Sequence, residues 1–80
     1  MPTVRFVWSP FLVAVRREAC PAARWIKAQK AWEMSDADAQ AFLAASHNRL
    51  SYVREYREIA VDQQRWLVGF VQGAPKIVSE

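Results

Sequence analysis

The segment Ser51–Gly73, SYVREYREIAVDQQRWLVGFVQG, decides the fold class of this chain because it can form either one long helix or a β-hairpin. As a helix it would present a single side-chain stripe, and Gly73 followed by Pro75 would end it. A chain with such a helix would be mostly α. The stripe would consist of Tyr52, Tyr56, Ile59, Gln63, Trp66 and Phe70.

A hairpin is the favoured interpretation of the same segment. Gly69 would lie within the last turns of the helix and would cost about 1 kcal/mol relative to Ala. The run RWLVGFVQ is rich in β-favouring residues, and DQQR can connect two strands. Against the hairpin, Glu55 and Arg57 interrupt the apolar face of its first strand. The balance predicts a C-terminal β-hairpin.

The residues before this segment predict a strand and then helices. TVRFVWS at 3–9 alternates apolar and other residues with a period of two, as a strand does. Ser9 can cap a short helix in FLVAVRREA with Pro10 at its first position, although a second strand is the alternative there. Further along, Ser35 can cap a helix over 34–48.

The segment CPAARWIKAQKAWE at 20–33 predicts an amphipathic helix. Trp25 and Trp32 would lie on its inner side, and three cations would lie on its outer side. These cations are Arg24, Lys27 and Lys30.

Together these elements predict a single small α+β domain over residues 1–80. It would have an N-terminal strand, two to three helices and a C-terminal β-hairpin, with the sheet packed against the face that bears Trp25 and Trp32. The alternative is a mostly α fold with a long C-terminal helix.

Positive charge is concentrated in the first part of the chain. The whole sequence has a formal net charge of +3. Residues 1–33 hold six basic and two acidic residues, whereas residues 34–80 hold five basic and six acidic residues. A basic segment can contact nucleic acid or an acidic protein surface. The residues predicted to contact a partner or a nucleic acid are Arg16, Arg17, Arg24, Lys27, Lys30, Arg54 and Arg57.

The sequence carries no motif for catalysis, a metal ion or a cofactor. Its one His and one Cys, His47 and Cys20, have no signature around them, and its glycines form no phosphate-binding loop. A single Cys cannot form an internal disulfide, which suits a reducing cytosol. The start MPTVRFVWSP does not resemble a signal peptide, and the apolar run FLVAV is too short to span a membrane. We therefore expect a cytoplasmic protein that is not an enzyme, has no cofactor and does not contact a membrane.

These observations favour a small binding protein that docks on a protein or nucleoprotein partner. It would be a regulator or inhibitor of the kind that phages and mobile elements encode. The four Trp residues fit either a core or an exposed contact surface, and a chain this small can also form a homodimer. The alternative is a nucleic-acid-binding protein that uses the basic helix, or a helix-turn-helix with its second helix starting near Ser51.

The order strand, helix, helix, strands, with VRFVWSP at the front and VREYREI opening the last part, is similar to the RelE/ParE-type toxin fold. In that family a basic sheet protein cleaves ribosome-bound RNA or poisons gyrase. The resemblance implies a toxin as a further alternative function. Under that alternative, the residues to test first are Arg54, Tyr56 and Arg57.

Overall fold

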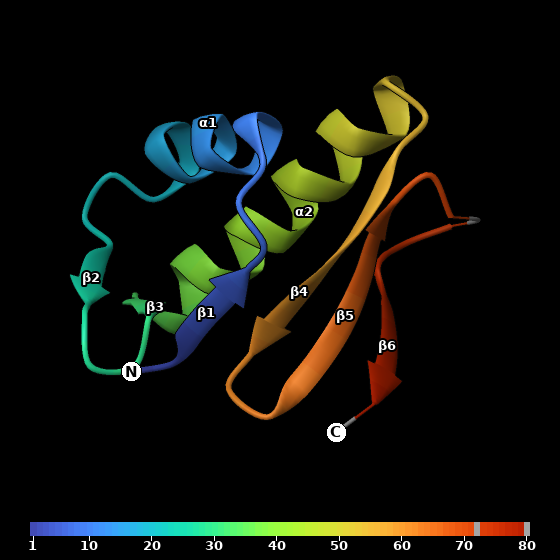
Figure 1. Cartoon of the computed structure of the whole chain (residues 1–80). Coiled ribbons are helices and arrows are strands. Elements are labelled where there is room, and N and C mark those ends of the chain that lie inside the picture. The colour runs from blue at the N-terminus through green and yellow to red at the C-terminus, as the bar shows by residue number, and fades with distance from the viewer. Residues whose placement is uncertain (72, 80) are drawn as a thin grey trace.

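The computed structural model describes residues 1–71 and 73–79, which fold into two helices and six strands (Figure 1). Gln72, inside the segment 51–73, lies outside the described residues. In chain order the elements are β1 (Thr3–Phe6), α1 (Pro10–Ala19), β2 (Arg24–Ile26), β3 (Ala31–Glu33), α2 (Asp36–Tyr52), β4 (Tyr56–Val61), β5 (Gln64–Gly69) and β6 (Lys76–Ser79).

All of the strand pairs in the described sheet are antiparallel, and the strand order is β2-β3-β1-β4-β5-β6. The first four strands and both helices follow the split βαββαβ order of ferredoxin-like domains, to which β5 and β6 add a further edge. The predicted α+β class, with its N-terminal strand and C-terminal hairpin, is confirmed. The mostly α alternative is not supported.

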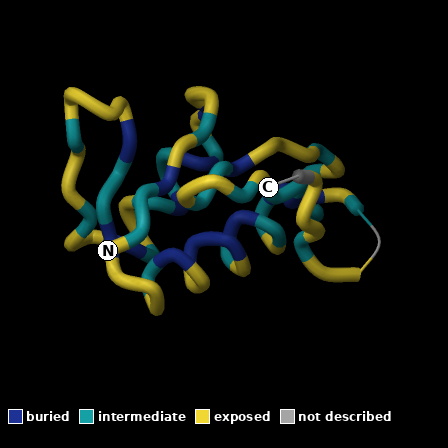
Figure 2. Tube along the Cα trace, turned by 90° about the horizontal axis from the view of Figure 1, so that it is seen from below, coloured by how far each residue is buried: buried dark blue, intermediate teal, exposed yellow. Residues whose placement is uncertain are grey.

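The core lies between α2 and one face of the sheet. Phe6 pairs with Ile59, and Ile59 pairs with Trp66, so these three side chains share a face. Phe6 contacts Phe42 of α2 with ring centroids 5.3 Å apart, which identifies this face as the helix side. Figure 2 shows the buried positions running through the middle of the molecule and the exposed ones at turns. The largest fully buried side chains include Phe42, Leu12, Met34, Leu50, Ile59, Val4 and Val68.

The segment 51–73 contains a hairpin, but a tighter one than the sequence predicts. β4 and β5 are joined by Asp62 and Gln63 alone, because Val61 already pairs with Gln64. Asp62 adopts a φ of 54°, and its carboxylate accepts a hydrogen bond from the Thr3 N–H at 2.9 Å. The turn is thereby fastened to the start of β1.

The charges that argued against the hairpin lie near the first residues of β4, where the strand is open to solvent. Glu55 precedes the strand, and the Arg57 guanidinium reaches its carboxylate at 3.0 Å. Both side chains are partly exposed, so neither is forced into the core.

The two helices begin where the sequence predicts. Pro10 occupies the first turn of α1 after Ser9, although the Ser9 side chain makes no capping hydrogen bond. Ser35 caps α2, since its hydroxyl accepts a hydrogen bond from the Asp38 N–H at 3.1 Å. α2 runs four residues past the predicted end, to Tyr52, and Arg54 then takes the left-handed conformation that reverses the chain.

The predicted helix over 20–33 is wrong, because this segment forms the hairpin β2–β3. Trp25 and Trp32 are seven residues apart, which puts them on one side of a helix but also lets them pair directly across a hairpin. β3 then pairs with β1, and this contact with a distant strand outweighs the helix propensity of the segment. The three cations Arg24, Lys27 and Lys30 consequently form no helix face.

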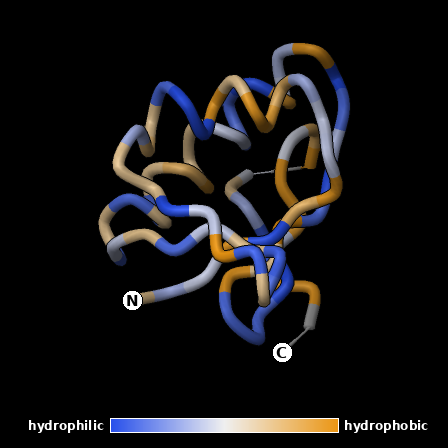
Figure 3. Tube along the Cα trace, turned by 60° about the vertical axis from the view of Figure 1, so that its left-hand side comes forward, coloured by the Kyte–Doolittle hydropathy of each residue, from blue (hydrophilic) through white to orange (hydrophobic). Residues whose placement is uncertain are grey.

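Strand β1 is shorter than the predicted strand over 3–9. It ends at Phe6, and both Val7 and Trp8 are exposed in the connection to α1. Figure 3 shows apolar and polar positions interspersed along the trace, and no described helix is long and apolar enough to cross a membrane.

Gly69 and Gly73 provide a matched pair for testing the hairpin. Both have positive φ, 108° and 84°, but an added Cβ at Gly69 would collide with the Glu55 carbonyl oxygen, whereas Gly73 has open space. We expect Gly73→Ala to lower the free energy of unfolding by about 1 kcal/mol through backbone strain. Gly69→Ala should lose at least about 3 kcal/mol, because overpacking adds to the strain. Urea denaturation followed by circular dichroism measures both, and equal losses would contradict this packing of Gly69.

Candidate functional site

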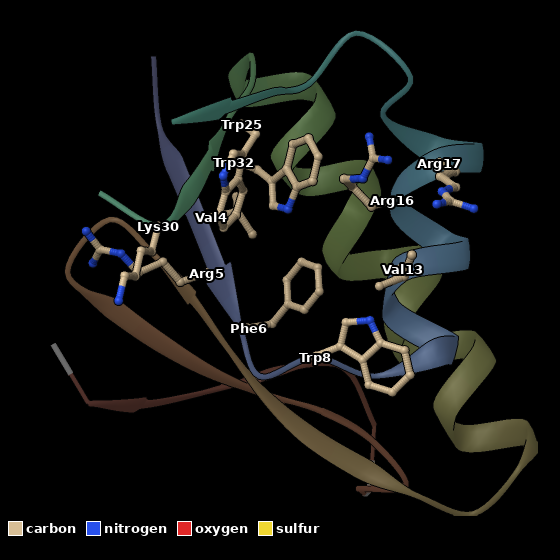
Figure 4. A pocket seen from close by; sticks show the side chains of 10 residues that line it. All are labelled: Val4, Arg5, Phe6, Trp8, Val13, Arg16, Arg17, Trp25, Lys30 and Trp32. Carbon is tan, nitrogen blue, oxygen red and sulfur yellow. The ribbon is translucent and has the colours of Figure 1, made fainter. Parts of the chain in front are cut away.

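A groove with a volume of about 360 Å³ opens between α1 and the strands β1, β3 and β2 (Figure 4). Its lining is mostly aromatic and cationic, and we call it the aromatic groove. The aromatic lining consists of Phe6, Trp8, Trp25 and Trp32. The cationic lining consists of Arg5, Arg16, Arg17 and Lys30, and none of the described lining residues is acidic.

The groove exists because α1 packs chiefly on α2 and leaves the β2–β3 end of the sheet uncovered. Trp25 pairs with Trp32, and Trp32 pairs with Val4, so both indoles lie on the helix side of the sheet together with the buried Val4. Side chains on this side would normally be covered by a helix. Here they face the flank of α1 across open space.

Trp32 is held in place from two directions. The Trp25 ring meets it nearly edge-on, with centroids 5.3 Å apart and an interplanar angle of 60°. From α1, the Arg16 guanidinium lies over the Trp32 ring at 4.0 Å from its centroid, a cation–π contact. Trp32 therefore anchors the other two side chains, and Arg16 ties α1 to β3 across the groove.

Two of the groove's indoles remain open to solvent. Trp8 is 74% exposed and Trp25 is 51% exposed, whereas Trp32 and Trp66 are partly buried against the core. The four Trp residues thus divide between the two roles that the sequence allowed. Figure 4 shows Trp8 at the end of the groove near Val13, with Phe6 between it and the Trp25–Trp32 pair.

The cations stand on two sides of the groove. Arg16 and Arg17 belong to the last turn of α1, where the helix dipole favours positive charge. Arg5 lies between Val4 and Phe6 on β1, so its side chain is directed to the other face of the sheet, where Figure 4 shows it beside Lys30. There Arg5 Nε donates to the Gln29 carbonyl at 3.3 Å. That hydrogen bond joins β1 to the β2–β3 turn.

The structure brings only some of the predicted contact residues together. Arg16, Arg17 and Lys30 line the aromatic groove. Arg24 precedes Trp25 on β2 and therefore points to the opposite face, while Lys27 lies in the β2–β3 turn outside the groove lining. Arg5 and the exposed Trp8 were not predicted. Their signal was present, since both lie in the most basic and aromatic third of the sequence.

Arg54 and Arg57 lie at the junction of α2 and β4, away from the groove lining. The Arg54 guanidinium stands 5.7 Å from the Phe70 ring centroid, and Arg57 pairs with Glu55. α2 ends at Tyr52 and the chain enters β4 at Tyr56, so the described residues contain no second helix that starts near Ser51 for a helix-turn-helix. The hairpin β2–β3 also separates the two described helices, so the element order that suggested a RelE/ParE-type toxin is not the order observed.

His47 and Cys20 both have structural partners. The Gly69 N–H donates to His47 Nδ1 at 3.1 Å, and His47 Nε2 donates to the Gly73 carbonyl at 2.8 Å, so His47 fastens α2 to the end of β5. Cys20 is buried, and its thiol donates to the Asp38 carbonyl at 3.2 Å. Burial raises the pKa of the Cys20 thiol, the Asp38 charge raises it further, and Arg16 opposes both effects. No group of three or more potential metal ligands occurs within residues 1–71 and 73–79.

Comparison of this chain with protein-family models, curated proteins and solved structures finds no match.

Replacing His47 tests its structural role. His47→Ala leaves the buried Gly69 N–H without an acceptor and should lower the free energy of unfolding by about 1–3 kcal/mol. His47→Asn keeps an acceptor close to the Nδ1 position and should recover part of that loss. Asn48→Ala, an exposed neighbour on the same helix, serves as the control and should change stability by less than about 0.5 kcal/mol. Chemical denaturation measures all three, and a neutral His47→Ala would contradict the role assigned to this side chain.

The raised pKa of Cys20 predicts a loss of stability in alkali. The folded state keeps the thiol proton to a higher pH than the unfolded state, whose pKa is near the ordinary 9.0. The contribution is therefore fully present below pH 9 and is lost as the pH rises through the folded pKa. Thermal unfolding at a series of pH values measures how steeply stability falls with rising pH, and Cys20→Ala should make this fall less steep. A Cys20→Ala variant with an unchanged slope would show that another group is responsible.

Proposed function

We propose that this chain is a non-enzymatic nucleic-acid-binding protein whose ligand lies in the aromatic groove. The observation that carries the proposal is that one groove combines exposed indoles with the cations Arg16, Arg17 and Lys30 and has no acidic side chain in its described lining. Phosphate groups can pair with the cations, and the flat faces of bases can stack on the indoles. Nucleic acids are the common ligands that present both groups in repeated alternation.

The placement of the cations supports phosphate binding on two sides of the ligand. Arginine forms paired hydrogen bonds with phosphate oxygens, and lysine contributes a point charge. With Arg16 and Arg17 on α1 and Lys30 at the β2–β3 turn, a backbone that crosses the groove would meet positive charge at entry and at exit.

The opposite face of the sheet differs from the groove in its aromatic content rather than in its charge. Arg5 and Arg65 lie on that face with Glu58, and Tyr56 lies there at the start of β4. The groove instead presents the two exposed indoles Trp8 and Trp25. These indoles are what favours the groove as the place of the ligand.

The groove favours nucleic acid over a purely protein partner. Protein contact surfaces are depleted in charge at their centres, whereas here cations from α1 and from the β2–β3 turn border a small aromatic space. The predicted role as a cytoplasmic regulator or inhibitor, and the predicted homodimer, stay predictions. Nucleic-acid binding is compatible with both.

Two charge-matched double variants test the proposal. Arg17→Gln with Lys30→Gln removes two groove cations, and Arg24→Gln with Lys76→Gln removes two cations elsewhere. In fluorescence anisotropy with labelled oligonucleotides, the groove variant should weaken binding and lower the log–log salt slope by about one to two. The second variant should bind nearly as the wild type does.

Three outcomes would count against the proposal. Absence of binding at low salt would end it, and equal weakening by both double variants would show that net charge acts without the groove. Polyglutamate that competes as well as an oligonucleotide of equal charge would assign the groove to an acidic protein partner. Thermal melting of each variant confirms that it is folded.

A further inference from the structure

The two exposed indoles indicate which form of nucleic acid the groove takes. Resting on the function proposed above, we propose that the ligand is a single strand, RNA or DNA, with an unpaired base stacked on Trp25 and another contacting Trp8. Aromatic rings bind nucleic acid through the flat faces of bases. In a duplex those faces are covered by neighbouring base pairs, so a stacking site needs bases that have left the stack.

Trp25 offers a better stacking surface than its neighbour Trp32. Trp32 has Arg16 over one face and the Trp25 ring against it, so its faces are largely occupied. Trp25 lies on β2, the edge strand, and half of its surface is exposed. A base can therefore lie on the Trp25 ring while Trp32 and Arg16 keep that ring in position.

Trp8 supplies a second surface at the other end of the groove. It lies in the connection between β1 and α1, and three quarters of its surface is exposed. Phe6 lies between the two ends (Figure 4). Two separated rings with cations on both sides suit a chain that passes along the groove and turns its bases inward.

The shape of the groove also favours a single strand. Its volume of about 360 Å³ is close to the lower limit for sites that bind one small molecule, which is the scale of a nucleotide unit and not of a duplex. A duplex would have to be contacted from outside by a projecting element. α1 is poorly suited to that task, since its first turns, PFLVAV, are apolar and its arginines lie in its last turn, whereas the N-terminal residues of a recognition helix contact the bases.

The test measures wild-type affinity for four labelled ligands of about twelve nucleotides. They are single-stranded DNA, single-stranded RNA of the same sequence, the DNA duplex, and a DNA strand with its central bases removed. We expect the intact single strands to bind at least about tenfold more tightly than the duplex or the abasic strand. The ratio of the affinities for the RNA strand and the DNA strand shows which of the two nucleic acids the groove prefers.

Variants locate the stacking. Trp25→Leu and Trp8→Leu should each weaken binding of the intact single strand by about 5- to 100-fold and leave the abasic strand unaffected. Tyr52→Leu, which removes an exposed aromatic ring outside the groove, should bind as the wild type does. Melting temperatures check that the variants fold, and the abasic comparison needs only the wild-type protein.

The outcomes separate this inference from the proposed function. Equal affinity for all four ligands, or a preference for the duplex, would overturn the single-strand inference while nucleic-acid binding stands. Unchanged binding by both Trp variants would overturn the stacking assignment. Absence of binding to every ligand would overturn the proposed function as well.

Discussion

The pairing of β1 with two strands at once is the interaction on which the structure depends. Val4 pairs with Trp32 on one side and with Val61 on the other, so a strand of four residues joins the N-terminal half of the sheet to the C-terminal half. The Thr3–Asp62 hydrogen bond fastens the same strand to the β4–β5 turn. Because β1 ends at Phe6, the chain leaves the sheet at once, and Trp8 is carried to the end of the groove instead of into the core.

The uneven distribution of charge along the sequence corresponds in the fold to one groove whose described lining contains cations and no acidic residue. All four groove cations come from residues 1–33, the segment with the positive surplus. That segment folds into β1, α1 and the β2–β3 hairpin, which together surround the groove. Four of the eight acidic residues belong to α2 and the β4–β5 hairpin, away from the groove lining. The sequence therefore predicted the positive charge of residues 1–33 and the presence of β1 and α1, but it did not predict the β2–β3 hairpin.

The fold class could be predicted because local sequence signals agreed with it. The candidate site could not be predicted, since it arises from contacts between segments that are distant in the sequence. Gly69 favoured the hairpin because glycine is unfavourable within a helix, and the structure adds a second reason for glycine at this position, since its φ is 108° and an added Cβ would collide with the Glu55 carbonyl oxygen. The prediction of a helix over 20–33 was wrong because the spacing of Trp25 and Trp32 fits a helix and a hairpin equally. Only the pairing of β3 with β1 decides between the two structures. The exposure of Trp8 follows from where β1 stops, which no local pattern in the sequence specifies.

The contact of Arg16 with Trp32 orders part of the groove in advance of the proposed binding of nucleic acid. Its guanidinium uses its flat face for the Trp32 ring, and the N–H donors of a guanidinium lie in its plane, so stacking does not consume them. A phosphate can therefore approach the edge of Arg16 while the contact with Trp32 persists. A long side chain free in solvent would lose about 2 kcal/mol of conformational freedom on binding, and the stacked Arg16 has already given up most of it. The same contact positions Trp25 through Trp32, so one cation prepares both the charged and the aromatic part of the groove.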